Sequence, residues 1–256
     1  MSRQTVRAEW AGRIEQLAAS GWPSRELESL GAWKLRTNGG VTTRANSVLA
    51  AGPFPAGDWL REVERFYRER GLPSCFHVSD SSPKELDELL AAAGYEISMN
   101  CLLLAAPIRE VLHRSAIYEL GEAKVTLAVQ LEEQWMNDFL RMEGFPEERR
   151  GGYLSIFTAM PAPKTFAAIY EAGEPLGVAT VVIEEGWAGI SNVVVDPRHR
   201  RKGVAGRLLQ ALVSWAAENG AEGLYLQVLA GNAPALELYS KLGFEAISAY
   251  HYRVHK

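Results

Sequence analysis

The chain has 256 residues, which is enough for one or two domains and a substantial buried core. Apolar residues make up 47% and charged residues 23%, so the composition excludes collagen-like, low-complexity and coiled-coil proteins. The net charge of −4, from 27 basic and 31 acidic residues, argues against a dedicated nucleic-acid-binding protein, because phosphate binding needs a basic surface. We therefore expect an ordinary globular protein with no specific nucleic-acid partner.

Cysteine content and hydropathy give expectations about the compartment. Cys75 and Cys101 are too few for a disulfide framework and lie in apolar runs typical of buried strands, so we expect reduced, inert thiols. No stretch approaches the roughly 20 apolar residues of a membrane span, and residues 1–10 have no signal-peptide core. The histidines lack metal-ligand spacing, so no metal is expected. These features predict a cytoplasmic protein without a membrane partner.

Hydrophobic periodicity predicts alternating helices and strands in the first half of the chain. The Asn-Gly-Gly turn at residues 38–40 favours a hairpin between two strands, and Asp58 is placed to cap the helix that follows. The expected elements are a helix at 5–19, strands at 33–36 and 44–49, a helix from 60 to about 71, a strand at 75–78, a helix at 83–93 and a strand at 95–104.

A longer series of elements begins near Val125. Its central strands are separated by short Gly-containing connections, which is typical of an antiparallel meander, and a strongly amphipathic helix follows. The expected elements are helices at 132–141 and 146–157, strands at 165–170, 176–183 and 188–195, a helix at 203–218, a strand at 224–228, a helix at 234–242 and a strand at 244–254.

The two halves share this order of elements, which indicates an internal repeat. The sequence from Gly94 to Ser98 is similar to that from Gly243 to Ser248, 149 residues later. The sequence match is short, so the repeat rests on the common order of helices and strands. We expect one lobe over residues 1–115 and a second over residues 116–256.

The stretch from Val193 to Gly206 leads from an apolar strand through a basic loop into a helix. The amino end of a helix leaves N–H groups unpaired, and small residues let a phosphate approach the backbone. The local charge of +4 comes from Arg198, Arg200, Arg201, Lys202 and Arg207 against Asp196, and the small residues are Gly203, Ala205 and Gly206. This pattern predicts phosphate binding, but a solvated turn, close packing or nonspecific nucleic-acid contact would use the same residues.

A second motif runs from Asn232 to Phe244. Its residues Asn232, Ala235 and Tyr239 recur at intervals of three and four, so a helix would place them on one face. Taken alone, Tyr239 could equally be a core residue with its hydroxyl at the edge. Its combination with the preceding strand and basic turn favours a functional role.

Together these motifs resemble those of the GNAT superfamily of acyl-CoA-dependent N-acyltransferases, over roughly residues 125–255. The Q/R-x-x-G-x-G/A signature of the superfamily matches Arg200, Gly203 and Ala205, and its N-x-x-A-x-x-x-Y-x-x-x-G-F pattern matches the second motif. The resemblance implies an α+β fold of the three-layer GNAT type, with a mixed, largely antiparallel sheet flanked by helices and two GNAT-like lobes.

The resemblance also implies a donor, a reaction and site residues. The signature would hold the pyrophosphate of acetyl-CoA, the strand with Val193 and Val195 would pair with the pantetheine arm, and Tyr239 would protonate the departing thiolate. The implied donor-binding residues are Val193, Val194, Val195, Arg200, Arg201, Lys202, Gly203, Val204, Ala205, Gly206 and Asn232. The implied reaction is acetyl transfer to a primary amine of a small molecule or peptide by direct attack in a ternary complex; the alternative is a CoA-binding sensor or pseudoenzyme.

The sequence does not single out a general base. An alkyl ammonium with a pKa of about 10.4 must lose a proton before it attacks a thioester. An ordered water could carry this proton, and the side-chain candidates are Glu143, Glu147, Glu148, Glu184, Glu185 and Asn192.

The first lobe departs from the pattern. Residues 50–57 contain two prolines and no arginine, and Leu90 stands at the position that corresponds to Tyr239. We infer a degenerate GNAT-like lobe in a tandem arrangement. The sequence leaves open the acceptor, a homodimeric state, and whether this lobe shapes the acceptor cleft through Trp33, Arg36, Arg44, Asn46 and Ser47.

Overall fold

The computed structural model describes residues 3–118 and 123–255, which form two compact units. The first unit consists of Met1–Leu103, Val228–Asn232 and Ala246–Lys256, and the second of Leu104–Gln227 and Ala233–Glu245. The last strand of the chain therefore groups with its N-terminal part. The division into lobes at residues 115 and 116 remains a proposal about the ancestry of the chain.

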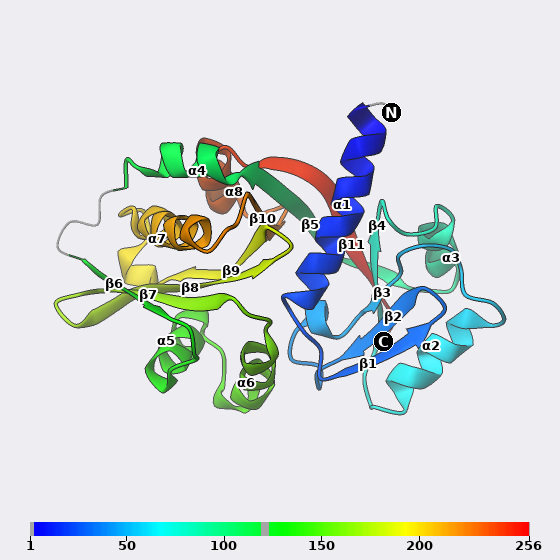
Figure 1. Ribbon diagram of the computed structural model, residues 1–256. Coiled ribbons are helices and arrows are strands. Elements are labelled where there is room, and N and C mark those ends of the chain that lie inside the picture. Colours follow the sequence, from blue (N-terminus) through cyan, green and yellow to red (C-terminus); the bar gives the residue numbers. More distant parts are fainter. Residues whose placement is uncertain (1–2, 119–122, 256) are drawn as a thin grey trace. The chain divides into compact units, whose positions relative to one another are not determined.

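The first unit contains a sheet with the strand order β1-β2-β3-β4-β11-β5 (Figure 1). Neighbouring strands run antiparallel from β1 to β3, β3 and β4 run parallel, and β4 and β11 run antiparallel. Its elements are α1 (Arg3–Ser20), β1 (Glu26–Leu30), β2 (Trp33–Thr37), η1 (Thr43–Ala45), β3 (Val48–Leu49), α2 (Trp59–Arg68), β4 (Ser74–Ser79), α3 (Leu86–Ala92), β5 (Glu96–Pro107), which continues into the second unit, and β11 (Glu245–His255).

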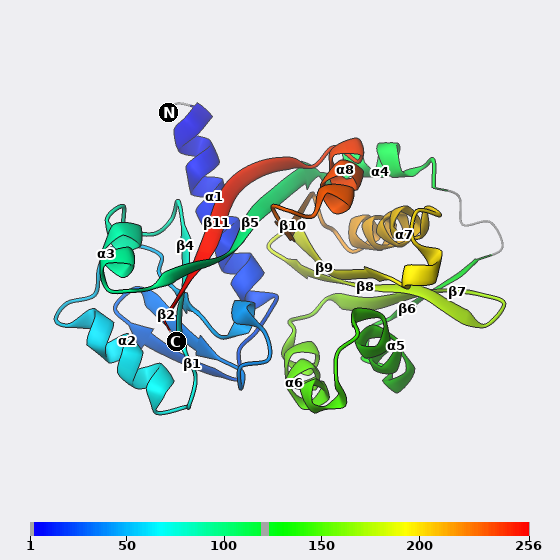
Figure 2. The ribbon, with the colours of Figure 1, turned by 180° about the vertical axis from the view of Figure 1, so that it is seen from behind.

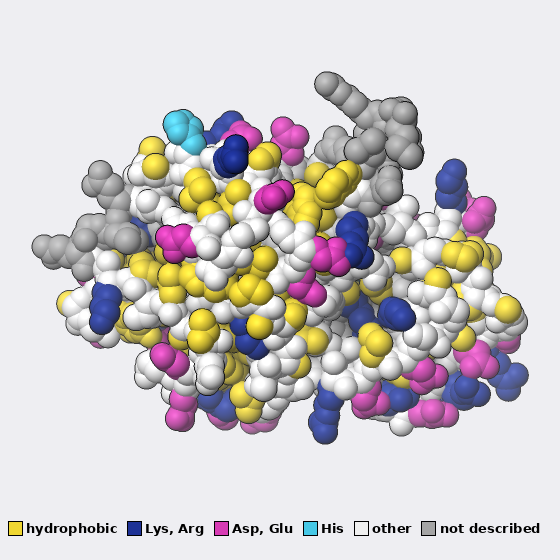
Figure 3. All heavy atoms as spheres, in the orientation of Figure 1, with side chains coloured by type: hydrophobic (Ala, Val, Ile, Leu, Met, Phe, Trp, Pro, Cys, Tyr) yellow, Lys and Arg dark blue, Asp and Glu magenta, His cyan; other side chains and the backbone are white. Residues whose placement is uncertain are grey.

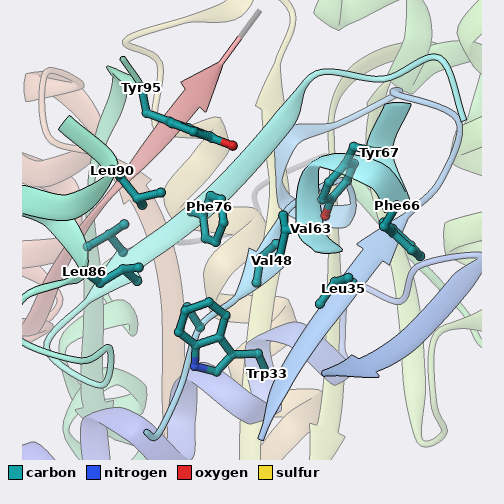
Figure 4. Packing of buried hydrophobic residues seen from close by; sticks show 12 residues of the cluster. Trp33, Leu35, Val48, Val63, Phe66, Tyr67, Phe76, Leu86, Leu90 and Tyr95 are labelled. Carbon is teal, nitrogen blue, oxygen red and sulfur yellow. The ribbon is translucent and has the colours of Figure 1, made fainter. Parts of the chain in front are cut away.

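Alternation along the strands gives this sheet two different faces. One face packs against α2 and α3 in an apolar core that includes Trp33, Phe76 and Leu90 (Figure 4). The outer side of α2 is solvated, with acidic and basic side chains interspersed (Figure 3). On the opposite face, the hydroxyl of Ser79 donates a 2.8 Å hydrogen bond to Glu15 of α1.

The predicted hairpin between residues 33–36 and 44–49 is wrong in detail. Residues 43–45 form a short 3₁₀-helix, and β3 retains only two residues. The cause is Asn46, whose side-chain oxygen accepts hydrogen bonds from the backbone N–H groups of Asn38 (2.7 Å) and Gly40 (2.9 Å). These bonds replace strand pairing in the loop.

The second unit contains a sheet with the order β10-β9-β8-β7-β6. Strands β7 to β9 form the predicted antiparallel meander, β6, which was not predicted, pairs antiparallel with β7, and β9 and β10 run parallel. Helix α7 covers one face and helices α5 and α6 cover the other (Figures 1 and 2). The elements are α4 (Ile108–Ser115), β6 (Lys124–Ala128), α5 (Glu133–Glu143), η2 (Glu147–Arg149), α6 (Arg150–Ala159), β7 (Lys164–Glu171), β8 (Glu174–Glu184), β9 (Trp187–Val195), η3 (Pro197–His199), α7 (Val204–Glu218), β10 (Gly223–Leu229) and α8 (Ala233–Lys241).

The expected fold class is confirmed, because this unit has a mixed, largely antiparallel sheet between two helical layers. Helix α6 begins later than predicted, after the 3₁₀-turn η2. Helix α4 was not predicted from the sequence. Across the described residues, no helix combines the length and apolar character needed to span a bilayer.

Candidate active site

Strand β9 contains a bulge in the middle of the second unit. Val178 of β8 pairs with Val194, but Thr180 pairs with Ser191, so β9 has one extra residue between these pairs. Asn192 takes up the extra length with a φ of +54°, a conformation that asparagine tolerates better than most residues. The bulge redirects the carboxyl-terminal half of β9.

Pairing between β9 and β10 ends next to this bulge. Their parallel register runs from Trp187 and Gly223 to Ile190 and Leu226, and no later pair occurs among the described residues. Backbone groups on this edge of β9 are consequently not paired with β10 between Ser191 and Val195. An extended amide chain could bond to such an edge in the manner of an added strand.

The predicted anion-binding turn follows β9 directly. Arg201 and Gly203 both have left-handed backbone conformations, with φ of 63° and 77°. The first backbone bond that closes α7 runs from the N–H of Arg207 to the carbonyl of Gly203 (3.0 Å). The earlier amides of the helix therefore face outward without intrahelical partners, as in the nests that bind anions.

The side chains of the basic turn have different roles. Arg198 donates two 3.0 Å hydrogen bonds to buried Asp196, which also accepts from Arg141 (2.8 Å). These bonds hold the pKa of Asp196 well below its usual range. Arg198 and Asp196 thus stabilise the turn as a pair, and Arg200, Arg201, Lys202 and Arg207 carry the predicted local charge of +4.

Tyr118 is a neighbour of the predicted turn that the sequence did not indicate. A Cβ atom built on Gly206 would lie 2.4 Å from the ring of Tyr118, and one on Gly203 would lie 3.9 Å from it. The small residue at position 206 therefore accommodates an aromatic ring against the first turn of α7. No sequence motif contains Tyr118, so only the folded structure reveals this contact.

Tyr239 lies on α8 and is 7% exposed. Its ring meets that of Phe244 edge to face at 5.7 Å, and its carbonyl accepts a 3.0 Å bond from the N–H of Phe244 after the helix end. Burial raises the pKa of Tyr239 to about 12, so the phenol stays protonated at neutral pH. Asn232, before α8, is exposed and groups with the first unit.

The candidates for the general base have different environments. Partial desolvation raises the pKa of Glu143, against the charges of Arg200 and Arg149, which lower it. Glu147 is instead held by Arg150, which lowers its pKa. The amide of Asn192 donates to Thr180 (2.8 Å), which gives Asn192 a structural role in the bulge. Glu184 lies at the end of β8, and Glu185 in the turn after it.

Comparisons with known proteins agree with a GNAT fold. The family described as "Probable histone acetyltransferase Rv0428c C-terminal" matches residues 11–254. The uncharacterized N-acetyltransferase YobR of Bacillus subtilis is 41% identical over 244 residues, which cover 94% of this chain and 97% of YobR. These matches define a GNAT-type N-acetyltransferase.

Solved structures show the same fold. A GCN5-related N-acetyltransferase from Kribbella flavida has a TM-score of 0.72 at 21% identity over 96% of each chain. A tandem GNAT protein from the clavulanic acid biosynthesis pathway has a TM-score of 0.64 at 14% identity, covering 77% of this chain and 68% of its own. The chain belongs to the Rv0428c C-terminal acetyltransferase family within the GNAT superfamily.

Proposed function

We propose that the chain transfers the acetyl group of acetyl-CoA to a primary amine by direct attack within a ternary complex. The observation that carries this proposal is the end of β9–β10 pairing at Ile190 and Leu226, which leaves Ser191–Val195 of β9 unpaired with β10 ahead of the turn that leads into α7. An unpaired strand edge suits the amide-containing pantetheine arm, and outward-facing amides suit the diphosphate. Both parts of the donor would then bind to consecutive segments of one chain.

The donor-binding residues divide by the group they would use. Val193, Val195 and the segment Gly203–Gly206 would act through backbone N–H and C=O groups. Val194 and Val204 are buried, so their side chains anchor these segments in the core. The exposed side chains of Arg200, Arg201 and Lys202 would add positive charge beside the phosphates. Asn232 would contact the cofactor arm.

Tyr239 would act as the general acid. The neutral amine would attack the thioester carbonyl carbon, the carbon–sulfur bond would break, and the phenol would donate its proton to the departing thiolate. The nitrogen of the new amide would release a proton to water, and the phenolate would regain a proton from water. Among the described residues, the Tyr239 hydroxyl makes no hydrogen bond that would compete for this proton. A phenol kept neutral by burial supplies the required proton without losing it to solvent at working pH.

The test combines binding with turnover. Calorimetric titration of the full chain with acetyl-CoA should give saturable binding, and release of free thiol should depend on an added primary amine. The amine panel should include a polyamine, an aminoglycoside, an amino acid and a peptide. Binding without thiol release for every amine would favour a CoA-binding sensor, and absence of binding would contradict the proposal.

A further inference from the structure

In the first unit, the face of the sheet that lies opposite the apolar core carries a buried cationic cluster. Arg36 on β2 is 3% exposed, and His77 on β4 is equally buried. Tyr250 and Tyr252 of β11 pack on His77, with ring centroids 4.3 Å and 5.6 Å from its own. The fifth member is Arg44, which is half-buried, lies 4.8 Å from the ring centroid of Trp22, and is close enough for its charge to lower the pKa values of Arg36 and His77. We call these five residues the Arg36 cluster: Arg36, Arg44, His77, Tyr250 and Tyr252.

Arg36 is charged, buried and only partly satisfied. Its Nε donates to the carbonyl of Ser47 and one Nη2 N–H donates to the Ser47 hydroxyl, both at 3.1 Å. A guanidinium has five N–H donors, so the end-on pair formed by Nη1 and Nη2 has no bonding partner among the described residues. This end-on pair matches the two oxygens of a carboxylate.

Among the side chains that the structure describes, those of residues 10–118 and 123–255, no carboxylate neutralises the two arginines. Neither Arg36 nor Arg44 forms an ion pair with a described acidic residue. The buried acid on this face, Glu15, bonds instead to the hydroxyls of Ser79 (2.8 Å) and Ser248 (3.3 Å). A buried guanidinium cannot shed its proton, so an uncompensated positive charge here is costly.

His77 is a second sign that the cluster is incomplete. Its Nδ1 atom is buried without a hydrogen bond to any described residue. Burial and the charge of Arg36 lower the pKa of His77 to about 3, so the imidazole is neutral and adds no further positive charge. A neutral imidazole can donate one hydrogen bond to an incoming oxygen.

The surrounding loop holds Arg44 in place before any ligand binds. The indole of Trp22 donates to the hydroxyl of Thr42 (3.0 Å), and the amide of Asn46 donates to the carbonyl of Thr42 (2.6 Å). Arg44 lies in the sequence between Thr42 and Asn46, which these bonds hold, and it is more exposed than Arg36 and His77. The arrangement is thus preorganised, with Arg36 buried and Arg44 half-buried.

We propose that the Arg36 cluster is a binding site for the anionic group, a carboxylate or a phosphate, of a small molecule. Arg36 would bind two oxygens of the anion through its end-on N–H pair, and Arg44 would close over it from the solvent side. His77 would hydrogen-bond to an oxygen of the ligand, and the tyrosine rings would line the site. This site lies within the first unit and does not depend on acetyl-CoA.

The test uses acetate and inorganic phosphate, because these small anions consist of little more than the carboxylate or the phosphate group itself. Each would replace chloride at constant ionic strength while the thermal unfolding midpoint of the full chain is measured at pH 7.5. We expect a saturable rise of at least about 2 °C with one of these anions, and the stronger one identifies the ligand as a carboxylate or a phosphate. No rise with either anion would overturn the proposal and leave Arg36 a purely structural residue.

Two variants and a matched control locate the effect. Arg44→Met removes the half-buried arginine. Arg36→Lys keeps the positive charge but removes the planar guanidinium. The control, Arg65→Met, removes an exposed arginine of α2 in the same unit. We expect anion affinity to fall roughly tenfold or more in Arg44→Met, in line with a lost charge-assisted bond, and to stay unchanged in Arg65→Met. Equal affinities in these two variants would contradict the assignment. Arg36→Lys should also lose affinity for the anion, because lysine lacks the planar fork, and wild-type affinity in this variant would contradict end-on binding.

Discussion

The side-chain amide of Asn192 donates a 2.8 Å hydrogen bond to the hydroxyl oxygen of Thr180, joining the bulge in β9 to the neighbouring strand β8. The Thr180 hydroxyl in turn donates to the carbonyl of Ser191 (3.1 Å). This small network fixes the left-handed residue that redirects β9. It links a buried threonine, which belongs to no motif, to the geometry of the proposed donor site.

Removing the Thr180 hydroxyl should therefore weaken donor binding. We expect Thr180→Val to reduce the free energy of unfolding by about 1–3 kcal/mol, because the Asn192 amide loses the shorter of its two hydrogen bonds. It should also weaken acetyl-CoA binding roughly tenfold. Thr165→Val is the matched control, since Thr165 is a buried threonine of β7 that bonds to the carbonyl of Ala128. Titration calorimetry should show a loss of affinity for acetyl-CoA in Thr180→Val only. Equal affinities in Thr180→Val and Thr165→Val would show that the bulge does not contribute to donor binding.

Tyr239→Phe tests the proposed general acid. Turnover should fall roughly 10²-fold or more, while the affinity for acetyl-CoA stays nearly unchanged. Because burial raises the pKa of Tyr239 to about 12, wild-type kcat should show no loss from Tyr239 ionisation below about pH 11. Tyr170→Phe, which removes a hydroxyl bonded to Asp138, serves as the control with full turnover. Unchanged kcat in Tyr239→Phe would remove Tyr239 from the mechanism.

Gly203→Val tests the turn before α7. Valine at a φ of +77° is strained, so this variant should reshape the amide cradle and weaken acetyl-CoA binding at least tenfold without unfolding the chain. Gly220→Val introduces comparable strain at the other end of the same helix. The φ of Gly220 is +84°, and a Cβ atom built on it would meet no neighbouring atom within 4 Å. Both variants should lose stability, and only Gly203→Val should lose affinity. Wild-type affinity in Gly203→Val would argue against the cradle.

The contact between Tyr118 and Gly206 should appear as coupling in a double-mutant cycle. Gly206→Ala forces the Tyr118 ring to move, because the new Cβ would lie 2.4 Å from it. We expect this variant to be destabilised in the wild-type background and nearly neutral when Tyr118→Ala is also present. Thermal unfolding should give an interaction energy of about 0.5–3 kcal/mol. Additive effects would show that the ring does not pack on α7 in solution.

An ion pair in the first unit should make the stability of the protein depend on pH in the acid range. The guanidinium of Arg253 and the imidazole of His251 bond to Asp87 and lower its pKa to about 2. Because the folded pKa lies below the unfolded value, this stabilisation is present above about pH 4 and is lost as the pH falls towards 2. The stability difference between wild type and Asp87→Asn should shrink over that range. A difference that is constant from pH 6 to pH 2 would contradict the assignment.

The sequence predicted those features that depend on local patterns. The amphipathic spacing of α7, the Asp58 cap of α2 and the meander of β7 to β9 all appear as expected. The motif around Gly203 also predicted a turn with outward amides, because glycine after a basic loop and before an apolar helix is a local signal.

Features that depend on distant partners were not predictable. Tyr118 meets Gly206 only through the fold, and Thr180 becomes important only because Asn192 lies opposite it. Similarly, the side-chain bonds of Asn46 convert an expected strand into a 3₁₀-turn, although the turn residues themselves were recognised.

A crystal structure with bound coenzyme A tests the central claim most directly. We expect diphosphate oxygens within hydrogen-bond distance of the amides at Gly203–Gly206, and the pantetheine arm along β9 at Val193 and Val195. A coenzyme bound elsewhere, or a first turn of α7 still covered by Tyr118 with no phosphate on its amides, would contradict it.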